Sequence, residues 1–379
     1  MAGLYLHIPF CEHKCIYCDF YSIENLEPIE SFVFLLKKEV QKYKNYGSPE
    51  SFDTIFFGGG TPSLLSPTTI GEILELLHAT FHIAPDAEIT VEANPGTVDR
   101  IKLEEYRKVG INRLSFGVQS FHQDDLKFLT RIHSSDEAKE AVRSAQKAGF
   151  DNINVDLIFS LPHQTLKRWE KNLEQAMLLN TQHISAYSLI VEEGTPLSRM
   201  VKAKQVSTLP TETDARLFEF TMQYLTANGF QQYEVSNYAK PGQECKHNVN
   251  YWTHGNYIGF GPSAHSFWSN RRWWNIANLR TYCERISNDQ LPVAGDEFLT
   301  GEQLLDETVM LGLRSRGVNL QRMKDELGFD LLGTQLPLIE ELLSKKMAIL
   351  NNNMLRLTAK GILLCDEISQ TLLARACAA

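Results

Sequence analysis

The sequence has little of what marks a secreted, membrane-spanning or nucleic-acid-binding protein. Seven cysteines in 379 residues are too few for a disulfide framework, and no run of about 18 apolar residues could cross a membrane. The net charge of −9 leaves no general basic surface for nucleic acid or anionic lipid. The N-terminus lacks the cationic start and the apolar stretch of a secretion signal. These absences favour a cytoplasmic location, no nucleic-acid partner and no transmembrane segment.

The composition is that of a folded globular protein with more than one part. Hydrophobic residues make up 43% and charged residues 22% of the chain, close to the average for globular proteins. The length of 379 residues exceeds the roughly 150 of a typical domain. Changes of pattern divide the chain into residues 1–230, 231–297 and 298–379. We expect a barrel-like domain, an aromatic-rich extension packed on it, and a C-terminal domain.

Residues 1–230 alternate between β-type runs and amphipathic helical stretches. This alternation is typical of a parallel sheet whose strands are connected by helices. The predicted strands are 4–8, 54–57, 88–92, 113–118, 153–159 and 183–189. The predicted helices are 31–46, 67–81, 98–109, 135–148 and 166–179. The pattern predicts an α/β fold, a partial (β/α)6 barrel, with its chemistry at the carboxyl ends of the strands.

The remainder of the chain has a different pattern. Residues 231–297 are rich in Tyr, Asn, Trp and Gly, and we expect loops and irregular strands there. Four helices are predicted in the third part: one at 298–313, a second that ends at 327, a third at 335–343 and a fourth that starts at 359. A hairpin turn is predicted at 351–353. This order is typical of a mostly helical, winged-helix-like module. Nine Lys or Arg against ten Asp or Glu from Thr300 onward leave no basic excess for DNA, so a structural or substrate-covering role is favoured.

Three of the seven cysteines lie within eight positions, directly after the first predicted strand. Cys11, Cys15 and Cys18 are separated by three and then two residues. Thiolates suit iron–sulfur clusters, zinc and copper(I), so the number of ligands decides the metal. Three thiolates fit a [4Fe–4S] cluster with one open iron, which can chelate the amino and carboxylate groups of S-adenosylmethionine (SAM). A structural zinc would need His7 or His13 as its fourth ligand.

Further candidate residues follow the next predicted strands. The glycines at 58–60, followed by Thr61, let main-chain atoms approach a ligand, and Glu92 suits a ribose hydroxyl or an ammonium group. Asp156 lies inside an apolar run, where a buried charge needs a partner. Two interpretations stay open for Asp156: a structural pair with Arg131, or a role for both residues in contacting SAM.

With these motifs assembled, the chain resembles the branch of the radical SAM superfamily that contains the oxygen-independent coproporphyrinogen III oxidases. The CxxxCxxC spacing is specific to that superfamily, and the resemblance runs through 5–11, 58–62, 91–95, 117–120, 156–158 and 233–237. It implies a radical SAM barrel with the [4Fe–4S] cluster on the three cysteines. It also implies SAM contacts from Tyr5, Gly59, Gly60, Thr61, Glu92, Gln119, Arg131 and Asp156.

Three features point to the heme chaperones of the same branch. Phe20 stands where the oxidases have a further cysteine, and ten residues precede Cys11 where the oxidases have an N-terminal extension. The segment 247–252 is similar to the HNxxYW motif of these chaperones. Because imidazole is a common axial ligand of heme iron, His247 is the candidate heme ligand, with Cys245 as an alternative. The competing interpretation of His247 is a loop histidine bonded to backbone.

Two functions therefore stay open. A chaperone would bind heme and pass it to an apo-hemoprotein, with the cluster and SAM regulating the transfer. An oxidase would use a 5′-deoxyadenosyl radical to decarboxylate two propionates of coproporphyrinogen III. The resemblance implies heme or porphyrin and an electron donor as partners, and it leaves a homodimer and the cleavage of SAM open. The missing cysteine and extension favour the chaperone.

Overall fold

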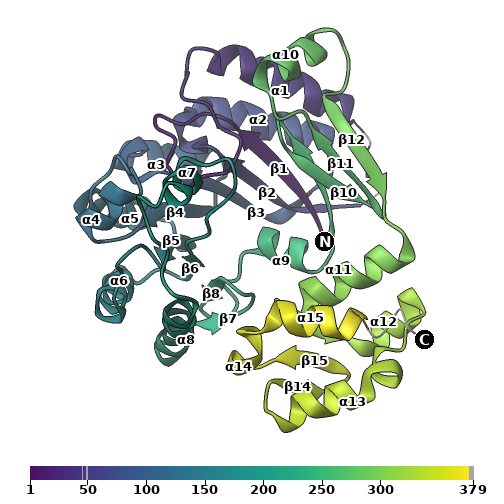
Figure 1. The fold of residues 1–379 in the computed structure, drawn as a ribbon. Helices are drawn as coiled ribbons and strands as arrows, with labels where there is room; N and C mark the ends of the chain where they lie inside the picture. The colour runs from purple at the N-terminus through teal and green to yellow at the C-terminus, as the bar shows by residue number, and fades with distance from the viewer. Residues whose placement is uncertain (45, 48–49, 375–379) are drawn as a thin grey trace.

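The computed structural model describes residues 1–44, 46–47 and 50–374. Its main part is a twelve-stranded sheet with the strand order β12-β11-β10-β9-β1-β2-β3-β4-β5-β6-β8-β7 (Figure 1). Six consecutive strands of this sheet are parallel: β1 (Ala2–Ile8), β2 (Phe52–Gly59), β3 (Ile83–Ala93), β4 (Arg113–Gln119), β5 (Ile153–Phe159) and β6 (His183–Ser188). They coincide with the six predicted strands, and the predicted α/β fold class is confirmed.

Helices connect the parallel strands and cover the outer face of the sheet. They are α1 (Ile29–Lys42), α2 (Pro67–Thr80), α3 (Arg100–Lys108), α4 (Gln123–Phe128), α5 (Ser135–Lys147) and α6 (Leu166–Leu178), with α7 (Pro196–Lys202) and α8 (Thr211–Ala227) after β6. Two short 3-10 turns are η1 (Pro62–Leu64) and η2 (Pro95–Thr97). Within the described ranges, no helix is long and apolar enough to span a membrane.

Successive side chains of each parallel strand point to opposite faces of the sheet. On β1, Leu4, Leu6 and Ile8 join the buried apolar cluster that also contains Phe32 of α1. The intervening positions point into the barrel, and many of them are polar. Such inward residues on the six strands are Tyr5, His7, Thr54, Phe56, Glu88, Glu92, Arg113, Ser115, Asn154, Asp156, His183, Ser185 and Tyr187. One face of the parallel strands therefore packs in the apolar core, and the other face carries the polar side chains that line the inside of the barrel.

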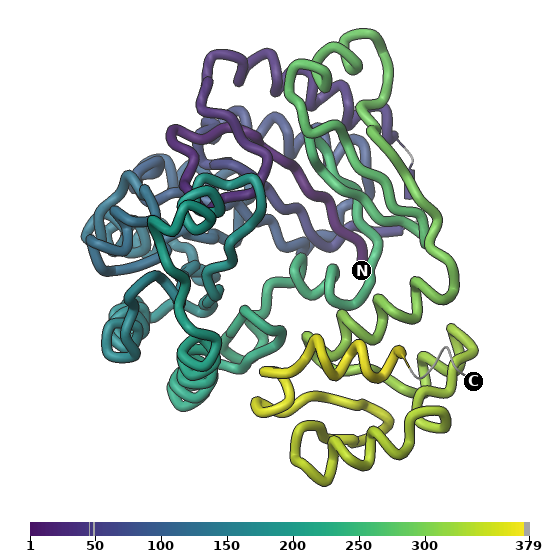
Figure 2. Tube along the Cα trace, in the orientation of Figure 1, coloured from purple at the N-terminus to yellow at the C-terminus, as the bar shows by residue number. Residues whose placement is uncertain are grey.

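Residues 256–298 contain four ordered strands, so the prediction of loops and irregular strands is wrong for these strands. The strand β9 (Asn256–Phe260) pairs in parallel with β1, and β10 (His265–Trp268), β11 (Arg271–Asn275) and β12 (Val293–Phe298) continue the sheet antiparallel. Figure 2 shows this green segment beside the purple N-terminal strand. These strands are four to six residues long, too short for a visible alternation of side chains.

The other elements of this middle segment lie at the far sheet edge and between the strands. The short strands β7 (Gln231–Gln232) and β8 (Asn237–Ala239) pair antiparallel beside β6. The helix α9 (Lys246–Trp252) precedes β9, and α10 (Leu279–Ser287) connects β11 to β12. The middle segment thus extends both edges of the parallel sheet.

The C-terminal module has its own core and the predicted helix and hairpin order. It comprises α11 (Gly301–Leu313), β13 (Val318–Asn319), α12 (Leu320–Leu327), α13 (Leu331–Ser344), β14 (Ala348–Asn351), β15 (Met354–Leu357), α14 (Ala359–Ile362) and α15 (Cys365–Ala374). Asn352 and Asn353 both have positive φ and form the expected turn. One boundary differs, because Phe298 ends β12 and the first helix begins only after Thr300, whose side chain caps it.

One buried carboxylate connects α1 to the sheet extension. Both oxygens of Glu39 accept hydrogen bonds: from the Asn275 side chain at 2.7 Å, the Tyr282 hydroxyl at 2.6 Å and the Gly261 backbone N–H at 2.8 Å. Burial raises the pKa of Glu39 to about 7. These bonds join the first helix to three separate segments of the middle region.

The substitution Glu39→Ala should lower the free energy of unfolding by about 3 kcal/mol or more, because it leaves three buried donors without an acceptor. Urea unfolding of the full chain measures this loss. Lys38→Ala, on the exposed side of the same helix, is the control and should change stability by less than about 0.5 kcal/mol. Equal effects of the two variants would contradict a stabilising role for the Glu39 network.

Candidate functional site

The three clustered cysteines lie on the loop that follows β1, at the carboxyl end of the parallel strands. Cys11 and Cys15 are buried and Cys18 is half-buried. The loop is held from several sides, since the Cys11 N–H donates to Ile23 O at 3.0 Å and the Ile16 N–H donates to Thr130 Oγ1 at 3.2 Å. The cysteine side chains are therefore placed by contacts with distant parts of the chain.

The thiols lie among groups that suit an anionic sulfur. The Arg131 guanidinium lies 3.4 Å from Cys15 Sγ, and the Thr61 hydroxyl lies 3.5 Å from Cys11 Sγ. Burial, followed by the neighbouring thiols, raises the pKa of Cys18 to about 11. Metal binding at this thiol must therefore release its proton, as is usual for thiolate ligands.

The donor set fits a cluster better than a single ion. In the described part of the chain, no three His, Cys, Asp or Glu side chains are placed to hold one metal ion. The thiolates of a four-iron cluster bind different irons and need not converge on one point. His7, a candidate fourth zinc ligand, has both ring nitrogens near other groups, Tyr5 OH at 3.1 Å and Tyr21 O at 2.8 Å. The other candidate, His13, pairs with Glu24 at 3.2 Å.

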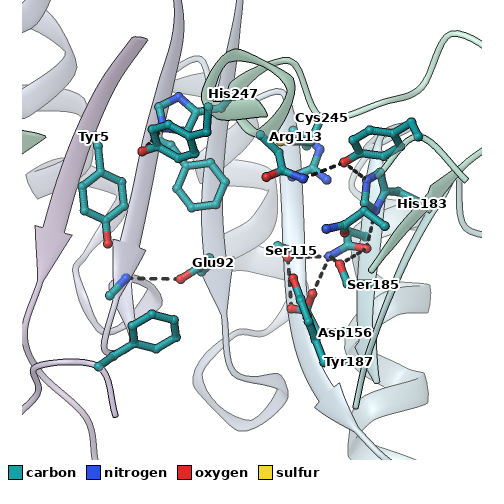
Figure 3. A pocket seen from close by; sticks show the side chains of 18 residues that line it. Tyr5, Glu92, Arg113, Ser115, Asp156, His183, Ser185, Tyr187, Cys245 and His247 are labelled. Atoms are coloured by element: carbon teal, nitrogen blue, oxygen red, sulfur yellow. Dashed lines mark hydrogen bonds between the residues drawn. The ribbon is translucent and has the colours of Figure 1, made fainter. Parts of the chain in front are cut away.

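Four of the predicted SAM-contacting residues line one cavity of about 350 Å³, which we call the first cavity. They are Tyr5, Gly59, Glu92 and Asp156. Figure 3 shows Tyr5 and Glu92 on one side of this space and Asp156, Ser185 and His183 on the other. The structure thus brings together residues of β1, β2, β3 and β5 that lie far apart in the sequence.

Of the other four predicted SAM residues, Gly60, Thr61 and Arg131 lie beside the cysteine loop, and Gln119 lies next to Arg131. The backbone N–H groups of Gly60 and Thr61 donate to Ile8 O and Phe10 O, at 2.8 and 2.7 Å. A Cβ atom on Gly60 would lie 2.6 Å from Phe10 O, so this position requires glycine. The side chains of Gln119 and Arg131 both pack over Gly117, and Arg131 donates to Gly117 O at 2.7 Å.

Glu92 is a half-buried carboxylate with few partners. Its Oε2 accepts a hydrogen bond from the Gly59 N–H at 3.3 Å. Burial, and to a lesser extent the charge of Asp156, raises the pKa of Glu92 to about 8. A carboxylate held in this state gains most from a ligand that brings a positive charge or a hydroxyl group.

Asp156 has different partners from those expected, and the interpretation as a structural pair with Arg131 is wrong. Asp156 accepts hydrogen bonds from Ser115 at 3.1 Å and Asn154 at 2.7 Å, whereas Arg131 bonds Asn94, Gly117 and Cys15. Burial raises the pKa of Asp156. The charge of the buried Arg113 guanidinium opposes this rise. Sequence reasoning missed Arg113, but its place at an inward position of β4 could have indicated it.

His247 lies in the first turn of α9, not in a loop, and its ring nitrogens contact side chains instead of backbone. Nδ1 lies 2.7 Å from Thr54 Oγ1 and Nε2 lies 2.8 Å from the Tyr251 hydroxyl. Burial lowers the pKa of His247 to about 3, so the ring is neutral. Binding of iron at Nε2 would require the bond to Tyr251 to break. The alternative thiol, Cys245, is buried with its pKa raised to about 12.

Comparisons with known proteins agree with this fold. A family model described as "Radical SAM superfamily" matches residues 5–176, and one described as "HemN C-terminal domain" matches residues 299–364. A solved structure of the coproporphyrinogen III oxidase HemN from Escherichia coli superposes with a TM-score of 0.84 at 22% identity, covering 98% of this chain and 89% of that one. That similarity shows the shared fold.

Relatives with higher identity are named "Heme chaperone HemW". The protein from Bacillus subtilis is 36% identical over 373 residues, which cover 97% of this chain and 98% of the relative. The protein from Escherichia coli is 44% identical over 267 residues, covering 69% of each chain. The chain therefore belongs to the radical SAM superfamily and, within it, to the HemW family.

Replacing Cys11, Cys15 or Cys18 by Ala should abolish the iron–sulfur absorbance of anaerobically reconstituted protein, because a three-thiolate site loses an iron ligand. Cys283→Ala, a half-buried cysteine on α10, is the control and should reconstitute like the wild type. Iron and sulfide analysis gives the measurement. Unchanged iron and sulfide in any of the three variants would remove that cysteine from the ligand set.

Glu92→Gln should raise the melting temperature of the metal-free protein more at pH 8.5 than at pH 5. The folded-state pKa of about 8 lies above the usual 4.5, so the wild type loses stability as the pH rises through this interval and the neutral amide does not. The same variant should bind SAM at least about tenfold more weakly after reconstitution, since it lacks the negative charge. Glu105→Gln, exposed on α3, is the control for both measurements. A stability gain without weaker SAM binding would place SAM elsewhere.

Proposed function

We propose that this protein binds heme and transfers it to apo-hemoproteins, using a [4Fe–4S] cluster and SAM as resident cofactors. The observation that carries the proposal is the near full-length relationship to the Bacillus subtilis protein named "Heme chaperone HemW". Phe20, two residues after Cys18, also supports the proposal, because a phenylalanine cannot ligate metal where the oxidases have a further cysteine. The shared fold with HemN does not by itself favour oxidase chemistry.

The residues of the site suit the two resident cofactors. Cys11, Cys15 and Cys18 would hold three irons, and the fourth iron would stay open for SAM. When bound, the cluster can supply one electron to SAM. Arg131 would stabilise the thiolate of Cys15, to which it already points at 3.4 Å.

Inside the first cavity, Tyr5, Gly59, Glu92 and Asp156 would bind SAM. The carboxylates of Glu92 and Asp156 would face its sulfonium, ammonium or ribose hydroxyl groups. Gly59 would let the backbone approach the ligand closely, since its φ of +107° is open to glycine. Gly60, Thr61 and Gln119 would shape the rim of this site beside the cysteine loop.

The remaining partners follow from this function. Transfer requires a heme donor and an apo-hemoprotein acceptor, and a reduced cluster requires an electron donor. A homodimer is a further part of the proposal. A reducing compartment such as the cytoplasm suits the free thiols, which include all six cysteines of the described residues. The three-part division at residues 1–230, 231–297 and 298–379 is proposed as the domain organisation.

The function is tested by an anaerobic assay on reconstituted protein that follows two reactions side by side. One sample contains heme-loaded protein and an apo-hemoprotein; the other contains coproporphyrinogen III, SAM and a reductant. We expect heme transfer and no decarboxylation, because Phe20 stands at the position where the oxidases have a further cysteine. Formation of protoporphyrinogen that depends on SAM would overturn the chaperone proposal in favour of the oxidase.

A further inference from the structure

A second and larger cavity lies beside the first, between the sheet extension and α11. Its volume is about 830 Å³, within the roughly 300–1,000 Å³ of typical small-molecule sites. Residues of β9, β10 and β11 form one wall, and Met310 and Leu311 of α11 form another. The first cavity, at about 350 Å³, has less than half this volume. A porphyrin-sized ligand therefore fits the second cavity better.

The second cavity contains an imidazole without a hydrogen-bonding partner. Five histidines line the two cavities: His7, His183, His247, His254 and His265. The first four each have at least one ring nitrogen within hydrogen-bonding distance of a protein group. Within the residues that the structure describes, His265 makes no such contact and is exposed. It is therefore the imidazole most available to an incoming metal.

The surroundings of His265 suit ligation of iron. Its ring stacks on the Trp274 indole, with centroids 6.1 Å apart and an angle of 25° between the planes, which favours one ring orientation. The residues His265 and Trp274 are also direct partners across β10 and β11.

The walls and charges of the cavity suit a flat aromatic ligand with one polar end. Tyr257, Phe267 and Trp274 provide aromatic surface. The charged groups in the cavity are Asp19, Arg272, Glu297 and Glu307, and Arg272 already pairs with Glu307 at 2.6 Å and Glu297 at 3.4 Å. His254 also bonds Glu307, at 2.8 Å. Because these carboxylates repel anions, the propionates of a porphyrin would remain at the open side of the cavity.

We propose that the second cavity is the heme site and that His265 is the axial ligand of the heme iron. This inference rests on the proposed heme-binding function and assigns it to a site distinct from His247. His247 then acts as a positioning residue: it holds the Tyr251 hydroxyl at 2.8 Å, and Tyr251 lines both cavities. Tyr5 and Phe20 also line both, so the heme and SAM sites are adjacent.

The test uses full-length protein titrated with hemin, reduced anaerobically with dithionite to the ferrous state, and followed by resonance Raman spectroscopy with excitation in the heme Soret band. His265→Ala should remove the iron–histidine vibration and weaken hemin binding at least about tenfold, whereas His247→Ala should retain that vibration. His265→Gly with added imidazole should recover the histidine-type spectrum. His78→Ala, on α2, is the control for a histidine outside both cavities.

The outcomes separate this inference from the proposed function. If the wild type does not bind hemin, the proposed function itself fails. If the wild type binds hemin and the spectrum and affinity of His265→Ala are unchanged, heme binding stands and the assignment to His265 is overturned. Loss of the vibration in His247→Ala alone would return the ligand to the first cavity. Thermal melting of each variant checks that the fold is intact.

Discussion

The first turn of α9 is held by one buried carboxylate, and the arrangement of the second half of the chain depends on it. Glu88 accepts hydrogen bonds from the backbone N–H groups of Lys246 and His247, each at 3.2 Å. Those N–H groups have no partner inside the helix, and a negative charge is favourable at a helix N-terminus. The charge of Glu88 is balanced by Arg113, 4.0 Å away. The helix so fixed leads directly into β9, which pairs with β1 and starts the sheet extension.

The same alternation that places Glu88 inside the barrel brings several acidic side chains together there. Glu92 and Asp156 both face the first cavity, and their mutual repulsion adds to burial in raising the pKa of Glu92. Arg113 is the cation that lines this cavity in the described part of the chain. A protein selected for stability alone would have little reason to place two such carboxylates in one cavity. A cationic cofactor such as SAM would relieve the repulsion, which is why the site is best understood as preorganised for that ligand.

The sequence predicted the parallel strands and the cysteine ligands because both are local patterns. A run such as 153–159 is apolar enough to be recognised alone, and the cysteine spacing is contained in one loop. The partner of Asp156 could not be predicted locally, because Ser115 and Asn154 approach it from the strand next to it and from its own strand two residues earlier. The state of His247 likewise depends on Thr54, which is 193 positions away. The short strands of the extension are stabilised by pairing with β1, a contact that no window of sequence contains.

Tyr251 links the chemistry of the two cavities through its contact with His247. Its hydroxyl lies 2.8 Å from His247 Nε2, and its ring packs edge-on against both the His247 imidazole and Tyr257. Tyr257 belongs to the wall of the second cavity, whereas His247 belongs to the wall of the first. A ligand that displaces Tyr251 from one side therefore changes the wall seen by a ligand on the other. Because such coupling is reciprocal in free energy, any influence of SAM on heme affinity requires an equal influence of heme on SAM affinity.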